Sequence, residues 1–563
     1  MSEQFDIVVI GSGAGALMAA VRSATAGASV VILEKQNYIG GTTARSGGGI
    51  WVPNNRFMKG AGVQDSEAEA FEYMRAVIPE DQVSDETIRM YIETVPKMLE
   101  FMMSETDAKY VPVPGYADYY PGVPGWKPGC RTMDCLPVDG RKLGDDLYKL
   151  QPLPPQSRAL GKVHMSILEG AKILAQSKGA RRTMASVFLR YYLDLPGRLK
   201  GRMDRRLTMG NGLVGGLLSA VKRLGIPVRL GMRVVELVSD GTRVTGVVTE
   251  TADGQRATFD VAKAVIAAAG GFEHNDKMRR NNLPCPTDSE WSAGTVGNTG
   301  DLIRAGRDIG AKLGLMNEAW WGPVVRRGRH PVVLFSEKSK PHLIIVDARG
   351  KRFMNESITY NSYGECMYEA KQSGFDSVPA YVIFDGQYRQ KYLFAGLVQS
   401  SLSPDWMNKK LFGPKGMLQK ADTLGELAQK LGIDATGLEA TAERFAGFAS
   451  NGVDEDFGRG SNDHDRMYGD HDVTPNPCLG AIDQPPFYGA RLYPGDIGTK
   501  GGLVIDDNAR VLKEDGMPIE ALYAAGNCTA SIMGDKYPGA GCTIGPALTM
   551  AYRAASHAMG LEA

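Results

Sequence analysis

The stretch FDIVVIGSGAGALMAAVRSATAGASVVILEK, from Phe5 to Lys35, decides the fold. It opens with a short apolar run typical of a buried parallel strand, and the glycine-rich turn Gly11–Ala16 follows at once. A small, apolar, helix-favouring segment then leads to a second apolar run that ends at Glu34. We therefore predict a strand–helix–strand unit of about 30 residues with the glycines in its first turn.

This turn suits a dinucleotide. Gly11 allows the tight turn, Gly13 lets the backbone approach a pyrophosphate, and Ala16 supplies the small residue needed for packing of the helix on the sheet. The N–H groups and dipole at the helix N-terminus favour the phosphates, and Glu34 is placed to accept a hydrogen bond from a ribose hydroxyl. The alternative is a plain tight turn, but the strand, helix and acid together predict a Rossmann-like site.

Two further glycine-rich stretches indicate a flavin. GGTTARSGGG, residues 40–49, follows directly, and a nicotinamide-only domain does not need it, whereas a two-domain flavoprotein does; a surface loop is the alternative. Near the C-terminus, Gly526-Asn527 and Gly539-Ala540-Gly541 precede a helix with Pro546 in its first turn. That helix could stabilise negative charge on a reduced flavin or be a simple docking helix.

Gly210–Gly215 also fits GxGxxG, but it follows no apolar strand and has no acid at the required distance. We interpret it as a helix start with small packing residues, so a built-in nicotinamide domain is not expected. The seven histidines show no metal-ligand spacing, and neither GxSxG nor CxxCH is present. We therefore expect no metal, which leaves tyrosines as candidate acids and bases.

Composition excludes several classes of protein. The 563 residues carry 64 Lys+Arg and 64 Asp+Glu, so the whole chain has no electrostatic footprint for nucleic acid. Seven cysteines without a CxxC pair favour reduced thiols in the cytoplasm. The N-terminus lacks a basic segment before its apolar run, which argues against a signal peptide, and no apolar run is long enough to span a membrane.

The segment from Arg158 to Arg206 departs from this neutral balance. It holds twelve basic residues against three acids, Glu169, Asp194 and Asp204, with large apolar residues at helical spacings between them. A solvated helical insert is one interpretation. The other is a peripheral membrane contact, which would suit an enzyme that takes a poorly soluble substrate from a bilayer.

Ten motifs in order give a family resemblance: GSGAGA, GGTTARSGGGIWVPNN, PGYADYYPG, AAGGFEHN, GNTGD, EAWWGP, GKRFMNES, PGDIGTKGGL, LYAAGN and KYPGAG. Together they resemble the 3-ketosteroid Δ1-dehydrogenases, within the wider group that includes fumarate reductase and succinate dehydrogenase flavoprotein subunits. The resemblance implies 1,2-dehydrogenation of 3-oxo-4-ene steroids to 1,4-dienes in steroid and sterol breakdown. A 3-ketosteroid 4-dehydrogenase and a fumarate-reductase-like ene-reductase stay open as alternatives.

The resemblance also implies roles for single residues. Tyr537 and the N–H of Gly541 bind the 3-keto oxygen, Tyr360 is the base that removes the C2 proton, and Tyr119 hydrogen-bonds that base while the C1 hydride passes to flavin N5. A tyrosine base near neutral pH needs a stabilised phenolate, because the ordinary pKa of tyrosine is near 10. Thr359 stands before Tyr360 where proline is common in the family, which bears on loop stiffness.

The expected architecture is α/β: a Rossmann-like FAD-binding domain, 1–316 and 491–563, with an inserted α+β catalytic cap, 317–490. Residues 40–49 contain no histidine, so the FAD is expected to be non-covalent, and its electrons would leave to an external acceptor, with quinone as the candidate. The expected cofactor-binding residues are Gly11, Ser12, Gly13, Ala14, Gly15, Ala16, Glu34, Lys35, Gly41, Thr42, Thr43, Ala44, Ser46, Gly47, Gly48, Gly49, Val234, Ala269, Gly270, Gly526, Asn527, Gly541, Thr543 and Ile544.

Overall fold

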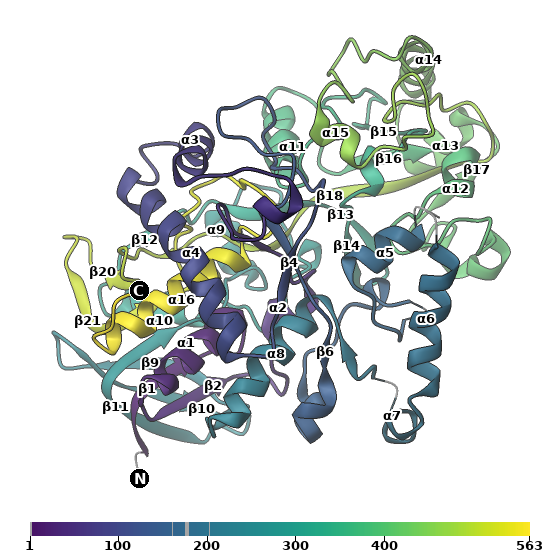
Figure 1. Cartoon of the computed structure of the whole chain (residues 1–563). Helices are drawn as coiled ribbons and strands as arrows, with labels where there is room; N and C mark the ends of the chain where they lie inside the picture. The colour runs from purple at the N-terminus through teal and green to yellow at the C-terminus, as the bar shows by residue number, and fades with distance from the viewer. Residues whose placement is uncertain (1–2, 160, 175–178, 202) are drawn as a thin grey trace. The chain divides into compact units, whose positions relative to one another are not determined.

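A computed structural model describes residues 3–159, 161–174, 179–201 and 203–563 (Figure 1). The chain forms two compact units. Unit 1 comprises Met1–Leu283, Gly294–Ala319 and Gly498–Ala563, and unit 2 comprises Pro284–Ala293 and Trp320–Ile497. Most of unit 2 is therefore one long insertion in the sequence of unit 1. The domain limits expected from the sequence stay a prediction.

Unit 1 is built on a mostly parallel sheet in the order β20-β21-β11-β1-β2-β8. The central strand β1 pairs in parallel with β2 and β11, and its residues Ile7–Ile10 are buried, as expected for a β-branched run covered on both faces. Antiparallel β10 and β9 extend from β11. The bounds are β1 Glu3–Ile10, β2 Val30–Glu34, β8 Val228–Leu230, β9 Arg233–Ser239, β10 Val244–Glu250, β11 Arg256–Ala267, β20 Arg510–Leu512 and β21 Pro518–Ala524.

Helices from distant parts of the chain cover this sheet. α1 (Ala14–Thr25) packs beside the C-terminal α16 (Ile544–Ala558), and Figure 1 shows the purple and yellow ribbons side by side. The sequence predictions of a helix after the first glycine turn and of a helix from about Ile544 are confirmed. The other helices are α2 Gly41–Arg45, α3 Glu67–Val77, α4 Asp85–Glu105, α8 Met209–Arg223, α9 Asp276–Asn282 and α10 Asp301–Asp308.

Two local predictions from the sequence are wrong. The sequence over 300–316 predicts a helix, but α10 ends at Asp308, because Gly310 takes a left-handed φ of +90° and the chain continues into β12 (Leu313–Gly314) against β19 (Gly502–Leu503). The stretch 108–160, rich in Pro, Gly and Tyr without a clear period, predicts an ordered loop, but it contributes short strands. These are β4 Tyr110–Pro112, β5 Thr132–Cys135 and β6 Val138–Asp139. β5 pairs with β4 and with β3 (Ile50–Trp51), and β6 pairs with β7 (Arg206–Leu207).

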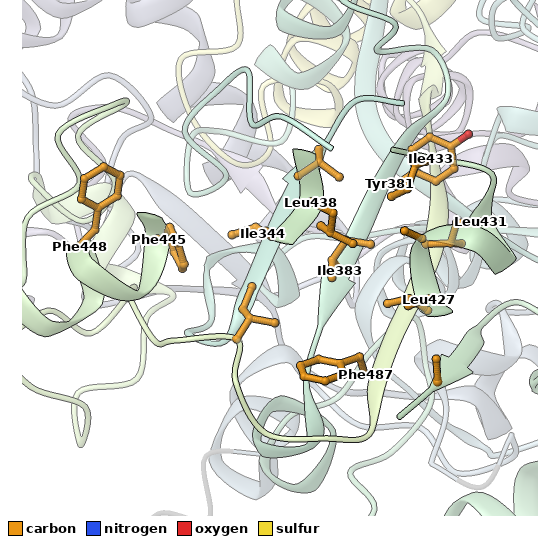
Figure 2. Packing of buried hydrophobic residues seen from close by; sticks show 14 of the residues in the cluster. Ile344, Tyr381, Ile383, Leu427, Leu431, Ile433, Leu438, Phe445, Phe448 and Phe487 are labelled. Atoms are coloured by element: carbon orange, nitrogen blue, oxygen red, sulfur yellow. The ribbon is translucent and has the colours of Figure 1, made fainter. Parts of the chain in front are cut away.

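Unit 2 contains a sheet in the order β14-β13-β18-β16-β15, with β17 on β18. The sequence over 423–450 carries two helical patterns, and the two helices found there pack on the sheet and bury a cluster that includes Ile344, Ile383, Leu427, Phe445 and Phe487 (Figure 2). The bounds are β13 Ala319–Arg327, β14 His330–Val333, β15 Leu343–Val346, β16 Ala380–Phe384, β17 Gln419–Ala421, β18 Phe487–Thr499, α11 Ser362–Gln372, α12 Gly386–Lys391, α13 Leu424–Leu431, α14 Ala435–Asn451 and α15 Asp463–Met467.

The basic segment 158–206 forms α5 Ile167–Leu174, α6 Ala180–Leu193 and α7 Leu195–Lys200; its residues 160, 175–178 and 202 lie outside the described part. Short 3₁₀ helices complete the fold: η1 Lys59–Ala61, η2 Gly140–Lys149, η3 Pro155–Ser157, η4 Ser289–Trp291, η5 Glu337–Ser339, η6 Asp405–Leu411 and η7 Gly526–Cys528. All seven cysteines are reduced thiols, and Cys285 is the exposed one. Among the described residues, no helix combines the length and apolar character that crossing a membrane requires.

Candidate active site

The turn between β1 and α1 can only be built from small residues. Gly11 has a φ of +103°, and a Cβ there would lie 2.4 Å from the carbonyl oxygen of Ala268. Gly13 caps α1 and offers no side-chain oxygen to the N–H groups of the first helical turn, which suits an anion at this end of the helix. Ala14 N donates to Thr43 Oγ1 over 3.2 Å, which joins the turn to the second glycine-rich stretch.

Glu34 lies at the end of β2 with its side chain buried. Its Oε2 accepts from Ser12 Oγ at 2.6 Å and its Oε1 accepts from Gln36 N at 2.8 Å. Burial raises the pKa of Glu34, while the hydrogen bond from Ser12 opposes that shift. Ser12 Oγ in turn accepts from Gly40 N at 2.9 Å, so one hydroxyl links both glycine-rich stretches to the acid.

The second stretch folds into α2 and packs against the start of α8. Gly48 has a φ of +73°, and a Cβ there would lie 2.4 Å from the carbonyl carbon of Met209. A Cβ on Gly210 would meet the carbonyl oxygen of Thr43 at 1.9 Å. The prediction that Gly210–Gly215 is a helix start with small packing residues is therefore confirmed.

The sequence analysis did not predict three residues that lie around this stretch, Arg45, Thr295 and Asn298. Thr42 Oγ1 accepts from Thr295 N at 3.0 Å and from Asn298 Nδ2 at 3.1 Å. Asn298 also lies against Gly270, where a Cβ would meet its Oδ1 at 2.5 Å. Arg45 Nε is buried without a hydrogen-bond partner among the described residues, and burial lowers the pKa of this guanidinium. The motif GNTGD and an arginine inside a glycine run were the available signals.

Every cofactor position expected from the sequence lies in unit 1. Lys35 Nζ is engaged by Asp301 Oδ2 and Thr299 Oγ1, both at 2.8 Å, so it supports the 299–301 turn. Thr543, at the N-cap of α16, donates its hydroxyl proton to the Tyr537 hydroxyl and accepts no hydrogen bond from the N–H groups of the helix. The side-chain-free cap of α1, the buried acid and the glycine cradle fit an FAD.

Tyr119 and Tyr537 meet in unit 1. Their rings stack with centroids 5.5 Å apart and planes 18° from parallel, and both side chains are buried. Tyr119 N donates to the carbonyl oxygen of Pro538 at 3.0 Å, and Thr543 Oγ1 donates to the Tyr537 hydroxyl at 3.3 Å. Gly541 has a φ of +105°, and a Cβ there would lie 2.4 Å from the backbone of Ile50, so only glycine fits.

Buried polar and charged groups hold the segment that carries Tyr119. Arg131, fully buried, pairs with Asp65 at 2.6 Å and with Asp118 at 2.8 Å, and we name these three residues the Arg131 cluster. Trp51 Nε1 also donates to Asp118 Oδ1 at 2.8 Å. Burial raises the pKa of Asp118 to about 6, although Arg131 and Trp51 act in the other direction. Because Asp118 precedes Tyr119, the cluster sets the position of that ring.

The loop from Tyr537 to Gly541 is tied down at several backbone atoms. Tyr73 hydroxyl donates to the carbonyl oxygen of Pro538 at 2.6 Å, and Thr132 Oγ1 donates to that of Ala540 at 3.1 Å. The buried ammonium of Lys500 donates to the carbonyl oxygens of residues 535 and 536, directly before Tyr537. The tyrosine hydroxyl and the Gly541 backbone are thus held before any ligand arrives.

Tyr360 lies in unit 2, just before the N-terminus of α11. Its ring meets Phe335 edge to face with centroids 4.9 Å apart, and its side chain is 7% exposed. Lys338, whose pKa burial lowers to about 7, donates through Nζ to the carbonyl oxygens of Glu356 and Ile358. The loop leading to Tyr360 is therefore anchored through its backbone.

A second buried charge cluster holds the same loop. Glu356 accepts from Arg352 at 2.7 Å on each oxygen and pairs with Arg459 at 3.2 Å; we name these three residues the Glu356 cluster. Arg352 also pairs with Asp454 at 2.8 Å. Burial alone would raise the pKa of Glu356, but the charges of Arg352 and Arg459 outweigh it and the pKa is lowered.

No group of three or more His, Cys, Asp or Glu residues in the described ranges is arranged to hold an ion.

Comparisons with known proteins show the family of the chain. The model of the family described as "FAD binding domain" matches residues 6–544. A 3-oxosteroid 1-dehydrogenase of Mycobacterium tuberculosis strain H37Rv is 41% identical over 99% of this chain and 98% of that protein. A 4-oxocyclohexanecarboxylate 2-dehydrogenase of Sinomonas cyclohexanicum is 36% identical over 98% of this chain and 92% of that protein.

A solved structure is similar over the whole length. The 3-ketosteroid delta1-dehydrogenase from Sterolibacterium denitrificans, in complex with 1,4-androstadiene-3,17-dione, is 40% identical with a TM-score of 0.94. The match covers 99% of this chain and 100% of that one. The chain therefore belongs to the FAD binding domain family of flavoenzymes and, within it, to the family of the 3-oxosteroid 1-dehydrogenases.

Proposed function

We propose that this chain is an FAD-dependent 3-oxosteroid 1-dehydrogenase, which converts 3-oxo-4-ene steroids into 1,4-dienes in steroid and sterol breakdown. One observation carries the proposal: Tyr537 and Gly541 frame a backbone loop, fixed in position, in the unit that carries the dinucleotide turn, with Tyr119 stacked on Tyr537. Whole-length similarity to 1-dehydrogenases supports it.

Tyr537 and the N–H of Gly541 would bind the 3-keto oxygen. The Tyr537 hydroxyl accepts a hydrogen bond from Thr543 Oγ1, and a phenol O–H is also a donor that suits a ketone oxygen. Two donors aimed at that oxygen stabilise the negative charge that develops on it as an enolate forms, in the manner of an oxyanion hole. This stabilisation acidifies the C2 proton of the steroid.

Tyr360 would remove the C2 proton. A tyrosine acts as a base near neutral pH only when its environment stabilises the phenolate, because its ordinary pKa is near 10. Tyr360 precedes α11, a helix of 11 residues whose N-terminal dipole favours a nearby negative charge. The hydrogen bond from Tyr119 that the family resemblance implies stays a prediction.

Residues of unit 1 would hold a non-covalent FAD. The N-terminus of α1 would bind the pyrophosphate, Glu34 a ribose hydroxyl, and the 41–49 stretch with Thr42 and Asn298 the remainder of the cofactor. When bound, FAD supplies the acceptor for the C1 hydride, and the electrons then leave to an external acceptor, which we propose is a quinone.

The deciding experiment compares substrates for the purified yellow holoenzyme. We expect an artificial dye to be bleached when androst-4-ene-3,17-dione is added, with the 1,4-diene as product. Formation of a 4-ene from 5α-androstane-3,17-dione without 1-ene would favour the 4-dehydrogenase. Oxidation of reduced viologen by fumarate would favour the ene-reductase, and preference for 4-oxocyclohexanecarboxylate would move the substrate class to simple cyclic ketones.

A peripheral membrane contact through α6 and α7 is the second part of this proposal. Leu193, Leu195 and Leu199 are 71%, 65% and 90% exposed. Arg181, Arg182 and Arg190 are exposed on α6, whereas Arg198 packs on Tyr191 at 3.7 Å and donates to the carbonyl oxygen of Met203. Exposed leucines and arginines on the same two helices suit an anionic bilayer, where each cation contributes about 1 kcal/mol.

Sedimentation with anionic vesicles tests this contact. We expect salt-sensitive binding that weakens when Arg181, Arg182 and Arg190 become Glu. Binding that is unchanged in this triple variant would remove α6 from the contact.

A further inference from the structure

A second exposed apolar surface lies in unit 2, around η6. Leu402, Trp406 and Met407 are 69%, 68% and 61% exposed, and Lys409 and Lys410 are exposed next to them. We name these five residues the Trp406 surface. Of the six tryptophans in the chain, Trp406 is the only exposed one; the other five are buried or half-buried. The Trp406 side chain is therefore not held in the protein interior as the other tryptophan side chains are.

The backbone under this surface is fixed. Arg389, which is 2% exposed, donates to the carbonyl oxygen of Val398 at 2.7 Å and to that of Ser403 at 2.8 Å. Asn408 Nδ2 donates to Ser403 Oγ at 2.8 Å, and Met407 N donates to the carbonyl oxygen of Pro404 at 3.1 Å. The large apolar side chains are thus presented by an ordered base.

The segment around η6 carries a net positive charge. Between residues 398 and 420 the acid is Asp405, and the cations are Lys409, Lys410, Lys415 and Lys420. Asp405 is already neutralised, since it accepts from Arg389 at 3.0 Å, from Lys420 at 2.8 Å and from the Tyr488 hydroxyl at 2.7 Å. Lys409, Lys410 and Lys415 are left to give the surface a positive charge.

We propose that the Trp406 surface inserts into the headgroup region of an anionic lipid bilayer. A tryptophan ring with a polar N–H and an apolar body is suited to that boundary, and leucine and methionine beside it would enter the acyl region. The lysines complement the anionic headgroups. Three apolar side chains on a short loop are fewer than a stable protein interface needs, at about 800 Å² per partner, but are enough for shallow insertion.

The test uses the full-length holoenzyme and vesicles of phosphatidylglycerol and phosphatidylcholine in equal amounts. We expect binding at low salt that falls at least roughly tenfold in the variant Trp406→Ser/Met407→Ser, because two inserting side chains are lost. Met517→Ser is the matched control, since Met517 is 63% exposed in unit 1, and it should bind like the wild type. Basal steroid oxidation, FAD absorbance and circular dichroism should be unchanged in both variants.

Fluorescence identifies the inserting ring. The wild type should show a blue shift of tryptophan emission on adding vesicles, and Trp406→Phe should bind within about twofold but lose the shift. A shift that persists in Trp406→Phe, or equal vesicle binding by wild type and the double serine variant, would overturn the proposal. So would a dimer in sedimentation velocity that the double serine variant abolishes, because the surface would then cover a second copy. These outcomes do not depend on turnover, so they are separate from the failure of the proposed dehydrogenation.

Discussion

The two units hold their tyrosines with opposite arrangements of charge. In unit 1 an arginine, Arg131, is shared by two carboxylates, and the neighbouring Tyr119 stacks on Tyr537. In unit 2 a carboxylate, Glu356, is shared by two arginines, and Tyr360 follows four residues later. Both arrangements bury ions where a lost partner is expensive. They differ in the charges that meet, because one arginine contacts two carboxylates in unit 1, whereas two arginines contact one carboxylate in unit 2.

That difference decides how each cluster responds to protons. The Arg131 cluster has a surplus carboxylate, and burial raises the pKa of Asp118 to about 6. In the Glu356 cluster two arginines contact one carboxylate, and they lower the pKa of Glu356 in spite of burial. Mild acid should therefore add a proton beside Tyr119 and leave the support of Tyr360 ionised.

The largest expected effect comes from Tyr360 itself. Tyr360→Phe should lower kcat by about 10³–10⁴-fold, the upper range for loss of a general base, while FAD stays bound. Tyr388→Phe is the matched control, because it removes another buried hydroxyl of unit 2, which donates to the carbonyl oxygens of Glu337 and Leu393. Stopped-flow reduction of the flavin by androst-4-ene-3,17-dione measures both. Wild-type kcat in Tyr360→Phe would end its role as base.

Breaking the Glu356 cluster should have the next largest effect. Glu356→Gln leaves Arg352 and Arg459 without their shared charge, so we expect a loss of about 3–5 kcal/mol in the free energy of unfolding in urea. The exposed Glu455→Gln in the same unit should change that free energy by less than about 0.5 kcal/mol. A loss below about 1 kcal/mol in Glu356→Gln would show that the cluster does not anchor the loop.

A hydroxyl in unit 1 comes third. Tyr537→Phe should cost about 2–4 kcal/mol of transition-state stabilisation, measured as kcat/KM, because one oxyanion donor is lost. Tyr91→Phe is its control, since Tyr91 is buried in the same unit and donates to the carbonyl oxygen of Trp51 at 2.8 Å. If kcat/KM is unchanged in Tyr537→Phe, the residue is only part of the cavity wall.

The smallest effect separates the two clusters by pH. A raised pKa stabilises the folded state below the unfolded pKa, and this stability is lost as pH rises through the folded value. The free energy of unfolding of the wild type minus that of Asp118→Asn should therefore fall by about 1 kcal/mol from pH 5 to pH 7, since burial raises the pKa of Asp118 to about 6. The same difference between the wild type and Glu356→Gln should not change in this range, because a carboxyl with a lowered pKa loses its stabilising effect only below pH 4.5. Parallel curves for both pairs would refute the contrast.

Local patterns predicted the dinucleotide turn because its parts lie within one strand–helix–strand unit ending at Glu34. The clusters had no such signal, since Arg131 and Asp65 are 66 residues apart and Arg459 and Glu356 are 103 apart. The prediction of a helix over 300–316 was wrong near Gly310, because the apolar pattern does not show the left-handed φ of this residue. Exposure of Trp406 was equally invisible, because composition alone predicts burial for such a side chain. The roles of Tyr119, Tyr360, Tyr537 and Gly541 stay predictions.

The insertion of unit 2 into the sequence of unit 1 also determines the order in which the two units can fold during protein synthesis. The strand β21, which pairs with β11, and the helix α16, which packs on α1, are both made after residue 517. The core of unit 2 lies within residues 344–487, so it can fold while the ribosome still holds the end of the chain. Unit 1 must wait with an open sheet edge until the final segment emerges. That segment also carries Tyr537, so a nascent chain gains the hydroxyl that we propose binds the ketone only when the sheet of unit 1 is completed.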